Sequence, residues 1–273
     1  MKTPVVIAAY EEAAYIGQAL QHLDAQTVEP VVVVNGEERH GPTARAAAEC
    51  GARVIEHELQ GKLPAIQAGL RSLGERALEP VLFLDADSRP LFPRRWSATM
   101  LGAMQAADTA AVVGGHRIFN DGPLLDNSYR TVRTYQDKRR MAEQHDTRAI
   151  SGANMGLWLR STHVLNKVMQ LEPTWPGEDW LIADTIVEQG GSLHYADSLK
   201  GSVKTSARSN PPIKELVGIP VEERRRLFFQ RYIERAAPGT QFAYIEGKLW
   251  PYSEFSLLNG MEPAMQAAEQ AVV

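Results

Sequence analysis

Apolar and polar positions alternate along the first third of the chain in blocks that are typical of an α/β protein. Four short runs have the length of strands, and three of them are apolar throughout, as buried strands are; the longer segments between them place apolar residues on one helix face. The runs are Val5–Ala9, Val31–Val34, Arg53–Glu56 and Val81–Leu84, and the helical segments are Glu11–Ala25, Ala44–Cys50 and Lys62–Leu73. This alternation predicts a mainly parallel sheet that helices cover on both faces.

The remainder of the chain shows a weaker pattern. We expect further strands at Ala110–Gly114 and Gly152–Leu159 and further helices at Asn127–Gln144 and Glu178–Gln189. A break at Pro211-Pro212 follows. The sequence therefore predicts one domain in residues 1–210 and a helical and irregular extension in residues 211–273, which includes a basic and aromatic helix at Glu222–Arg235.

The composition narrows the class of protein. The chain has 273 residues, of which 44% are hydrophobic, and 29 basic residues stand against 33 acidic ones for a net charge of −4. This balance provides no strongly basic face, so we expect no nucleic acid partner. The single cysteine, Cys50, excludes an internal disulfide and fits a reducing compartment. The chain opens on a strand-like run instead of a signal peptide, and its longest aliphatic run, Val31–Val34, is too short to cross a bilayer, so we expect a cytoplasmic protein.

Polar residues directly follow three of the predicted strands. They are Tyr10-Glu11-Glu12, Asn35-Gly36 and Asp85-Ala86-Asp87. Parallel sheets bind ligands at the carboxyl ends of their strands, so these residues are candidates for a site. Two carboxylates after a buried strand, Asp85 and Asp87, would be costly without a cation or hydrogen-bond donors. A hard divalent cation with oxygen ligands satisfies them, although Asp-x-Asp also occurs in loops and helix N-caps.

Other charged residues have both a structural and a functional interpretation. Glu178 and Asp179 precede an apolar helix, where acids are favoured in the first turn and where a carboxylate could also act as a general base. Lys62 stands at a loop-to-helix junction, where a cation either suits a phosphate or lies in solvent. Lys204 and Arg208 could close over a diphosphate, and an exposed basic strand face is the alternative.

Five segments in one order resemble the family 2 glycosyltransferases and related enzymes of the GT-A fold. The first is the opening strand and loop, and the second resembles a helix that begins Gly-Lys and ends Gly-Leu. The others are the Asp-x-Asp, a Gly-Ala-Asn strand on the acceptor side, and a Glu-Asp before the catalytic helix. In this chain they are Val5–Gly17, Gly61–Leu70, Asp85–Asp87, Ser151–Gly156 and Pro176–Asp179, and together they span roughly residues 4–208.

The resemblance implies a hexosyltransferase that takes its sugar from a nucleotide-sugar. Residues 1–90 would be a Rossmann-like nucleotide-binding half and residues 91–210 the acceptor-side half. Asp87 would hold Mg²⁺ or Mn²⁺ with the donor diphosphate, and Asp85 would contact the ribose or a metal-bound water. Asp179, beside Glu178, would be the base in a single displacement that inverts the anomeric centre. The other implied donor-binding residues are Ala8, Tyr10, Glu12, Asn35, Lys62, Lys204 and Arg208, and the implied acceptor-side residues are Gly152, Ala153, Asn154 and Trp180.

The chain departs from the family pattern at four positions. The family usually has proline at Ala8, asparagine at Glu11, aspartate at Asn35 and asparagine at Gln67. Several of these positions line the nucleoside pocket, so UDP is the default donor base, and GDP or another nucleotide stays open. His194, on a later strand, is either a further metal ligand or a structural residue.

Other functional classes also use an α/β fold. A dehydrogenase would need Gly-x-Gly-x-x-Gly after the first strand, and the turn there contains no glycine. A nucleotidyltransferase usually opens with a Gly-rich basic loop, which Ala8–Glu12 does not resemble. A non-catalytic nucleotide-sugar-binding protein stays open, as does a retaining enzyme similar to the glucosyl- or mannosyl-phosphoglycerate synthases.

The acceptor side carries the least information. We expect acceptor specificity in residues 119–147 and in the tail after Pro211, and the acceptor could be a saccharide, a lipid-linked sugar or a small molecule. The tail helix Glu222–Arg235 sets aromatic residues among arginines, which suits an anionic membrane, but its glutamates and the net charge oppose that contact. We therefore expect the helix to pack on the domain and expect no membrane contact.

Overall fold

A central sheet of seven strands organises the described part of the chain. In this computed structural model the described residues are 2–107, 110–114, 117–119, 152–172, 178–199, 202–205, 242–245 and 248–251. The strand order is β3-β2-β1-β4-β8-β6-β9, and only β8 among these strands runs antiparallel to its neighbours. The strands are β1 (Thr3–Ala9), β2 (Val28–Asn35), β3 (Arg53–His57), β4 (Val81–Asp85), β6 (Ala110–Gly114), β8 (Asn154–Leu157) and β9 (Ser192–Tyr195). The predicted α/β fold with a mixed, mainly parallel sheet is confirmed.

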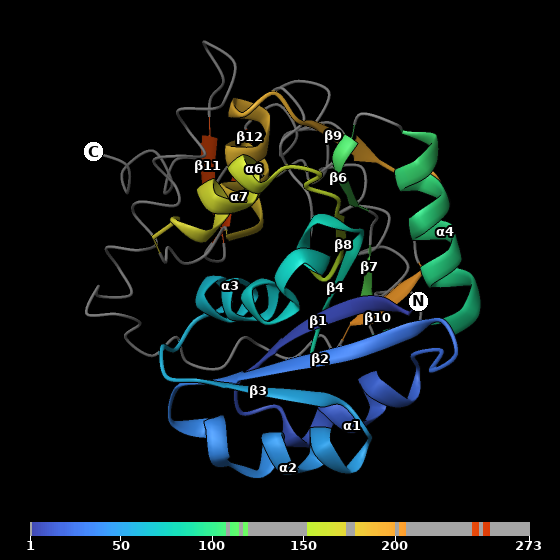
Figure 1. The fold of residues 1–273 in the computed structure, drawn as a ribbon, viewed down its shortest axis with the longest axis vertical. Coiled ribbons are helices and arrows are strands. Elements are labelled where there is room, and N and C mark those ends of the chain that lie inside the picture. Colours follow the sequence, from blue (N-terminus) through green and yellow to red (C-terminus); the bar gives the residue numbers. More distant parts are fainter. Residues whose placement is uncertain are drawn as a thin grey trace.

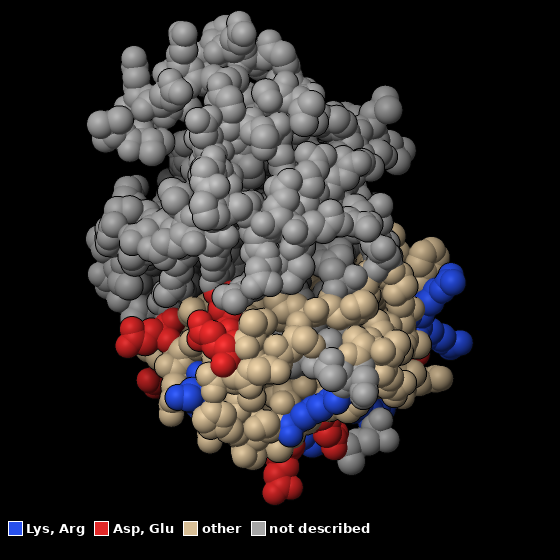
Figure 2. All heavy atoms as spheres, turned by 90° about the horizontal axis from the view of Figure 1, so that it is seen from above, with Lys and Arg blue, Asp and Glu red and all other residues tan. Residues whose placement is uncertain are grey.

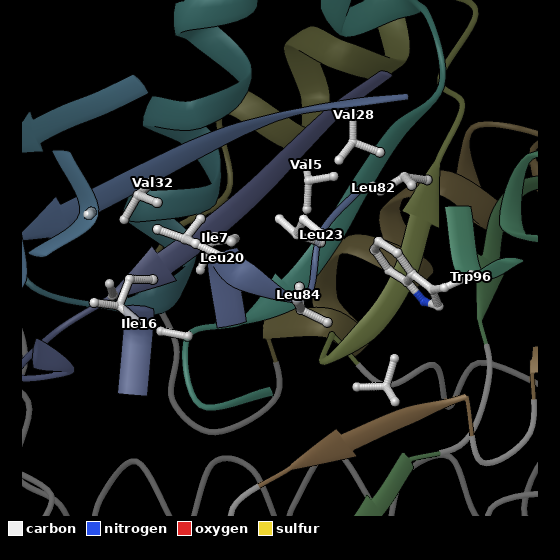
Figure 3. Packing of buried hydrophobic residues seen from close by; sticks show 14 of the residues in the cluster. Val5, Ile7, Ile16, Leu20, Leu23, Val28, Val32, Leu82, Leu84 and Trp96 are labelled. Atoms are coloured by element: carbon white, nitrogen blue, oxygen red, sulfur yellow. The ribbon is translucent and has the colours of Figure 1, made fainter. Parts of the chain in front are cut away.

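Helices cover both faces of this sheet (Figure 1). One face packs against α1 (Ala13–Gln21), α2 (Pro42–Glu49) and α4 (Pro93–Ala106), and the other against α3 (Lys62–Leu73), α6 (Thr162–Met169) and α7 (Glu178–Glu188). Alternate residues of β1 supply the two cores: Val5 and Ile7 belong to the first, and Val6 belongs to the second. Figure 3 shows the first core, where side chains from β1, β2, β4 and α1 meet and Trp96 of α4 closes the cluster. Both faces are apolar because both are covered.

A smaller sheet of three strands lies beside the carboxyl end of β4. Its strands are β5 (Ser88–Pro90), β10 (Val203–Thr205) and β7 (Arg117–Phe119), in that order. Strand β10 is antiparallel to β5 and parallel to β7. Because β5 begins directly after Asp87, the chain enters this smaller sheet as soon as it leaves the Asp-x-Asp segment.

Several predicted boundaries and elements need correction. The first helix begins at Ala13 and not at Glu11, because Glu11 has a φ of 54°, which lies in the left-handed region. Helices α4 and α6 were not predicted, and the predicted helices at 127–144 and 222–235 lie outside the described residues.

The predicted helical and irregular extension contains a hairpin that sequence analysis missed. Strands β11 (Phe242–Ile245) and β12 (Lys248–Pro251) pair in antiparallel fashion. Two aromatic-rich runs separated by only two residues, one of them glycine, were the signal that could have revealed it. No helix among the described residues has the length and apolar character that crossing a membrane requires.

Gly69 allows α3 to lie unusually close to β1 and β2. A Cβ atom at Gly69 would stand 2.5 Å from Cγ1 of Val6 and 3.3 Å from Cγ2 of Val33. Val6 is buried and β-branched, so its methyl group has little freedom to move away. The Gly-Leu at the end of the helix motif therefore has a packing role here.

We expect Gly69→Ala to destabilise the protein by about 1–2 kcal/mol. Overpacking costs about 1–3 kcal/mol, and the better helix propensity of alanine returns about 0.5–1 kcal/mol. Gly102→Ala is the matched control, because Gly102 lies on the exposed side of α4 and a Cβ there meets nothing within 4 Å. That variant should gain about 0.5–1 kcal/mol. Urea unfolding measures both, and equal gains in the two variants would contradict the close approach.

Candidate active site

The ends of the central strands bring the predicted site residues to one edge of the sheet. In the parallel register, Ala8 of β1 is paired with Asp85 of β4, and Ala9 is paired with Val34 of β2. Asn35 follows at the end of β2. Strands β1, β2 and β3 end on the left in Figure 1. Figure 2, seen from above, shows several acidic side chains on that same left side of the described surface.

Asn35 is a structural clamp at this edge. Its side-chain Nδ2 donates to the Ala9 carbonyl at 3.2 Å, and its Oδ1 accepts a hydrogen bond from the Gly61 N–H at 3.0 Å. The side chain is only 2% exposed. The polar atoms of Asn35 therefore face the backbone of β1 and of the loop before α3, and its contact with the nucleoside stays a prediction. An aspartate, which is usual in the family at this position, could not donate a hydrogen bond to the Ala9 carbonyl.

Gln67, another departure from the family pattern, also has a structural partner. Its Nε2 donates to the carbonyls of Val168 and Leu171 at 3.0 and 2.9 Å, at the end of α6. Val168 lies in the last turn of α6 and Leu171 lies just beyond it, where carbonyls are not fully satisfied by bonds within the helix. Gln67 therefore joins α3 to α6 and does not line a nucleoside pocket.

Tyr10 and Gln60 meet over Gly36 beside the clamp. Gly36 has a φ of 68°, and a Cβ atom there would stand 3.1 Å from Cβ of Gln60 and 3.3 Å from the Cε2 atom of Tyr10. Tyr10 is half-buried and directly follows the end of β1. Glu12, also half-buried, donates its backbone N–H to Oγ1 of Thr43 at 3.0 Å. Gln60 was not predicted, although it directly precedes the Gly61-Lys62 pair that was.

Lys62 lies at the centre of the site. Its Nζ is 2.5 Å from Oδ1 of Asp85 and 3.3 Å from Oε1 of Glu178. Burial disfavours the charge of Lys62, but Asp85, Glu178 and Asp179 outweigh that effect and hold the pKa of the amine above its ordinary value. Carboxylates therefore surround the amine of Lys62 in this structure, and its contact with a donor phosphate stays a prediction.

Glu178 is the most buried acid at the site. It is 8% exposed, and burial is the largest influence on its carboxyl and raises its pKa. Lys62 opposes this shift, and the carboxylates of Asp179 and Asp85 add to it. Acids are favourable in the first turn of α7, where Glu178 and Asp179 both stand.

Gly152 lies against both Lys62 and Asp179. Its N–H donates to Oδ2 of Asp179 at 3.1 Å. A Cβ atom on Gly152 would stand 3.1 Å from Nζ of Lys62 and 3.6 Å from Cβ of Asp179. The predicted acceptor-side glycine therefore belongs to the same cluster as the predicted base, and its lack of a side chain leaves room for the lysine.

Asn154 and Ala153, predicted on the acceptor side, lie in the core of the structure. Both are 0% exposed. Oδ1 of Asn154 accepts the Trp96 Nε1–H at 2.9 Å, and its Nδ2 donates to the Leu199 carbonyl and to Oγ of Ser202, each at 3.3 Å. The side chain thus fixes the turn before β10 and is not presented to an acceptor. Only the backbone of Trp180 is described, within α7.

Lys204 lies on β10, which pairs with β5, the strand that begins directly after Asp87. In the antiparallel register Lys204 is paired with Arg89, and Thr205 with Ser88. Its backbone is therefore close to the Asp-x-Asp segment, as a contact to a diphosphate requires. Its side chain and all of Arg208 lie outside the described residues.

The donor set at Asp85 and Asp87 suits a metal that is shared with a substrate. Asp87 is half-buried, and its Oδ1 accepts a hydrogen bond from Oγ of Ser88 at 3.4 Å. Within the described residues, no three His, Cys, Asp or Glu side chains are grouped so that they could hold an ion. Mg²⁺ commonly uses one or two carboxylates and takes its remaining ligands from water and substrate phosphates. The residues present fit that kind of site.

The structure does not bring His194 to this site. It lies on β9, at the edge of the sheet, and β8 and β6 separate that strand from β4. Three strand spacings amount to roughly 14 Å. The expectation of a metal ligand is corrected, because a ligand must lie within about 2–3 Å of the ion.

Comparison with known proteins agrees with the fold and the motifs. The family model described as glycosyl transferase family 2 matches residues 5–167. No curated protein matches the chain.

Solved structures give the same picture at the level of the fold. Glucosyl-3-phosphoglycerate synthase from Mycobacterium tuberculosis is 16% identical with a TM-score of 0.53, and the match covers 92% of this chain and 87% of that one. Mannosyl-3-phosphoglycerate synthase from Rubrobacter xylanophilus is 14% identical with a TM-score of 0.45, covering 92% and 85%. TarS from S. aureus is 15% identical with a TM-score of 0.48, covering 76% and 60%.

At these identities and scores only the first likeness is informative, and it shows the fold alone. The family model is stronger, because it matches more than half of the chain and includes the Asp-x-Asp segment, the Lys62 helix and Gly152. The chain therefore belongs to glycosyl transferase family 2.

Proposed function

We propose that this glycosyltransferase moves a hexosyl group from a nucleotide-sugar to an acceptor hydroxyl, with Mg²⁺ or Mn²⁺ and with inversion at the anomeric carbon. The observation that carries the proposal is the convergence of Asp85 and Glu178 on Lys62. It supports one site that contains both the metal motif and the predicted base, although they belong to different halves of the chain. A UDP-sugar is the default donor, the acceptor is a saccharide, a lipid-linked sugar or a small molecule, and the compartment is the cytoplasm.

The donor would bind along the ends of β1, β2 and β4. Asp87 and Asp85 would hold the metal, which neutralises charge on the diphosphate when it is bound. Lys204 would face the same diphosphate from β10, since its strand pairs with the one that follows Asp87. Tyr10 offers an aromatic face for the base beside Gly36.

The acceptor hydroxyl would attack the anomeric carbon while the bond to the diphosphate oxygen breaks. The proton of that hydroxyl would pass to Asp179, whose Oδ2 is held by the Gly152 N–H. This hydrogen bond places a donor against Oδ2 of Asp179 and so orients the carboxylate that would act as the base. The electron pair of the broken bond stays on the departing nucleoside diphosphate.

A donor screen tests the proposal. We expect one nucleotide-sugar, in the presence of Mn²⁺ and a mixture of acceptor sugars and small alcohols, to release nucleoside diphosphate at a rate that EDTA abolishes. UDP-sugars and GDP-sugars form the first panel. Donor binding without release of nucleoside diphosphate from any donor would indicate a binding protein, and release of pyrophosphate from a nucleoside triphosphate and a sugar phosphate would indicate a nucleotidyltransferase.

A further inference from the structure

One half-buried ammonium group joins the two halves of the candidate site. Lys62 is the first residue of α3, in the nucleotide-binding half, and Glu178 is the first residue of α7, in the acceptor-side half. Asp85 ends β4 between them. The side chains of Lys62, Asp85 and Glu178 are 28%, 21% and 10% exposed, so water screens their charges only in part.

The position of the ammonium group is fixed from two sides. Gly61, directly before Lys62, has a φ of 134° and donates its N–H to Oδ1 of Asn35. The backbone at the start of α3 is thereby tied to the end of β2. On the other side, Gly152 leaves only 3.1 Å between the place of a Cβ atom and Nζ of Lys62. The backbone before Lys62 is therefore held by the fold, and its ammonium group lies against Gly152 and beside two carboxylates.

Without Lys62 the cluster would contain only acidic side chains. Asp85, Glu178 and Asp179 all influence the ammonium group, and Glu178 and Asp179 are adjacent in sequence. Like charges gathered in a partly buried site repel one another. Asp179 itself accepts the Gly152 N–H, so it depends on the same strand that packs against the lysine.

We propose that Lys62 is a positioning residue, a counter-ion that holds Asp85 and Glu178 together and thereby sets Asp179 beside the donor site. This assigns Lys62 a different role from a phosphate ligand, and it rests on the proposed function. The two roles make different predictions. A phosphate ligand contributes to donor binding, whereas a counter-ion contributes to turnover through the geometry of the two carboxylate motifs.

The test is a cycle of Lys62→Met, Glu178→Gln and the double variant. Methionine keeps the length and apolar stem of lysine and removes only the charge. We expect Lys62→Met to lower kcat on the order of 10²-fold, because a misplacement of about 1 Å at a reacting group has that effect. The donor KM should change less than about threefold. The double variant should have a higher kcat than Lys62→Met, because one of the uncompensated carboxylates is gone. Lys167→Met, on the exposed side of α6, is the matched control and should resemble the wild type.

Gly152→Ala provides a second variant that leaves every charge in place. The added methyl group should displace the ammonium and lower kcat with little change in the donor KM. A higher donor KM in Lys62→Met, together with a double variant no better than the single one, would overturn the proposal and identify Lys62 as a donor ligand.

Thermal unfolding separates a failure of this inference from a failure of the proposed function. Lys62→Met should lower the Tm by at least about 4 °C, and the double variant should recover part of that loss. These melting temperatures need no substrate. If the wild type transferred no sugar, the proposed function would fall while recovery in the double variant would still support the charge coupling. Additive losses of Tm would overturn the coupling even in an active enzyme.

Discussion

Asp87→Ala should abolish both sugar transfer and metal-dependent donor binding while the protein remains folded. Asp87 leaves the end of the buried strand β4 and is itself half-buried, so its removal leaves no cavity in the core. The described residues supply no third carboxylate or histidine grouped to take its place. A cation shared between two carboxylates and a diphosphate would keep only Asp85 as a protein ligand, and Asp85 is already paired with Lys62.

Calorimetry measures this expectation directly. Donor and Mn²⁺ together should give a binding signal with the wild type and none with Asp87→Ala, and circular dichroism should be unchanged. Glu79→Ala is the matched control, since Glu79 is an exposed acid just before the opposite end of the same strand. It should bind donor and metal as the wild type does. Undiminished binding by Asp87→Ala would remove the Asp-x-Asp segment from the metal site.

The central sheet could be predicted from sequence because its strands are buried on both faces. Val31–Val34 are all 0% exposed, and a run of four valines leaves few alternatives to a covered strand. The same pattern placed the strand ends, and with them Asp85 and Asp87, at one edge. Helix α4 escaped prediction because it carries few large apolar residues apart from Trp96, Met100 and Met104.

The roles of individual polar residues could not be predicted in the same way. Asn154 matches an acceptor-side motif in sequence, yet its partners Trp96 and Ser202 come from distant segments that only the fold brings together. Likewise, the side-chain amide of Asn35 forms hydrogen bonds with backbone groups of two other segments. A motif fixes the residue type and its place on a strand, but the direction of the side chain depends on the neighbours that the strand acquires.

Lys62 shows the same limit for charges. A cation at the start of a helix suits a phosphate, and nothing local in the sequence indicates that carboxylates occupy that position instead. Asp85 and Glu178 reach it from β4 and α7. The contact of Gly152 with this amine could not be predicted either. A glycine in the sequence indicates conformational freedom of the backbone, but it does not indicate which atom occupies the space that a side chain would fill.

Asp179→Asn should reduce kcat by roughly 10²–10⁴-fold, which is the usual contribution of a general base. Asparagine has nearly the same shape, and its carbonyl oxygen can still accept the Gly152 N–H that Oδ2 of Asp179 accepts at 3.1 Å. The geometry is therefore kept while the proton acceptor is lost. Donor affinity should barely change, because the donor is held at the ends of β1, β2 and β4. Glu188→Gln, an exposed acid at the other end of the same helix, removes one charge from α7 and should leave turnover unaltered.

The anomeric configuration of the product tests whether Asp179 acts as the base in a single displacement. A base that deprotonates the acceptor in a single displacement must produce inversion, since the acceptor enters opposite the departing diphosphate. Inversion together with the kcat loss in Asp179→Asn supports that step. Retention would mean that the sugar leaves and the acceptor enters on the same face, in which case Asp179 cannot be the base from this position. Wild-type turnover in Asp179→Asn with chemistry as the slow step would reduce the residue to a favourable charge at the start of α7.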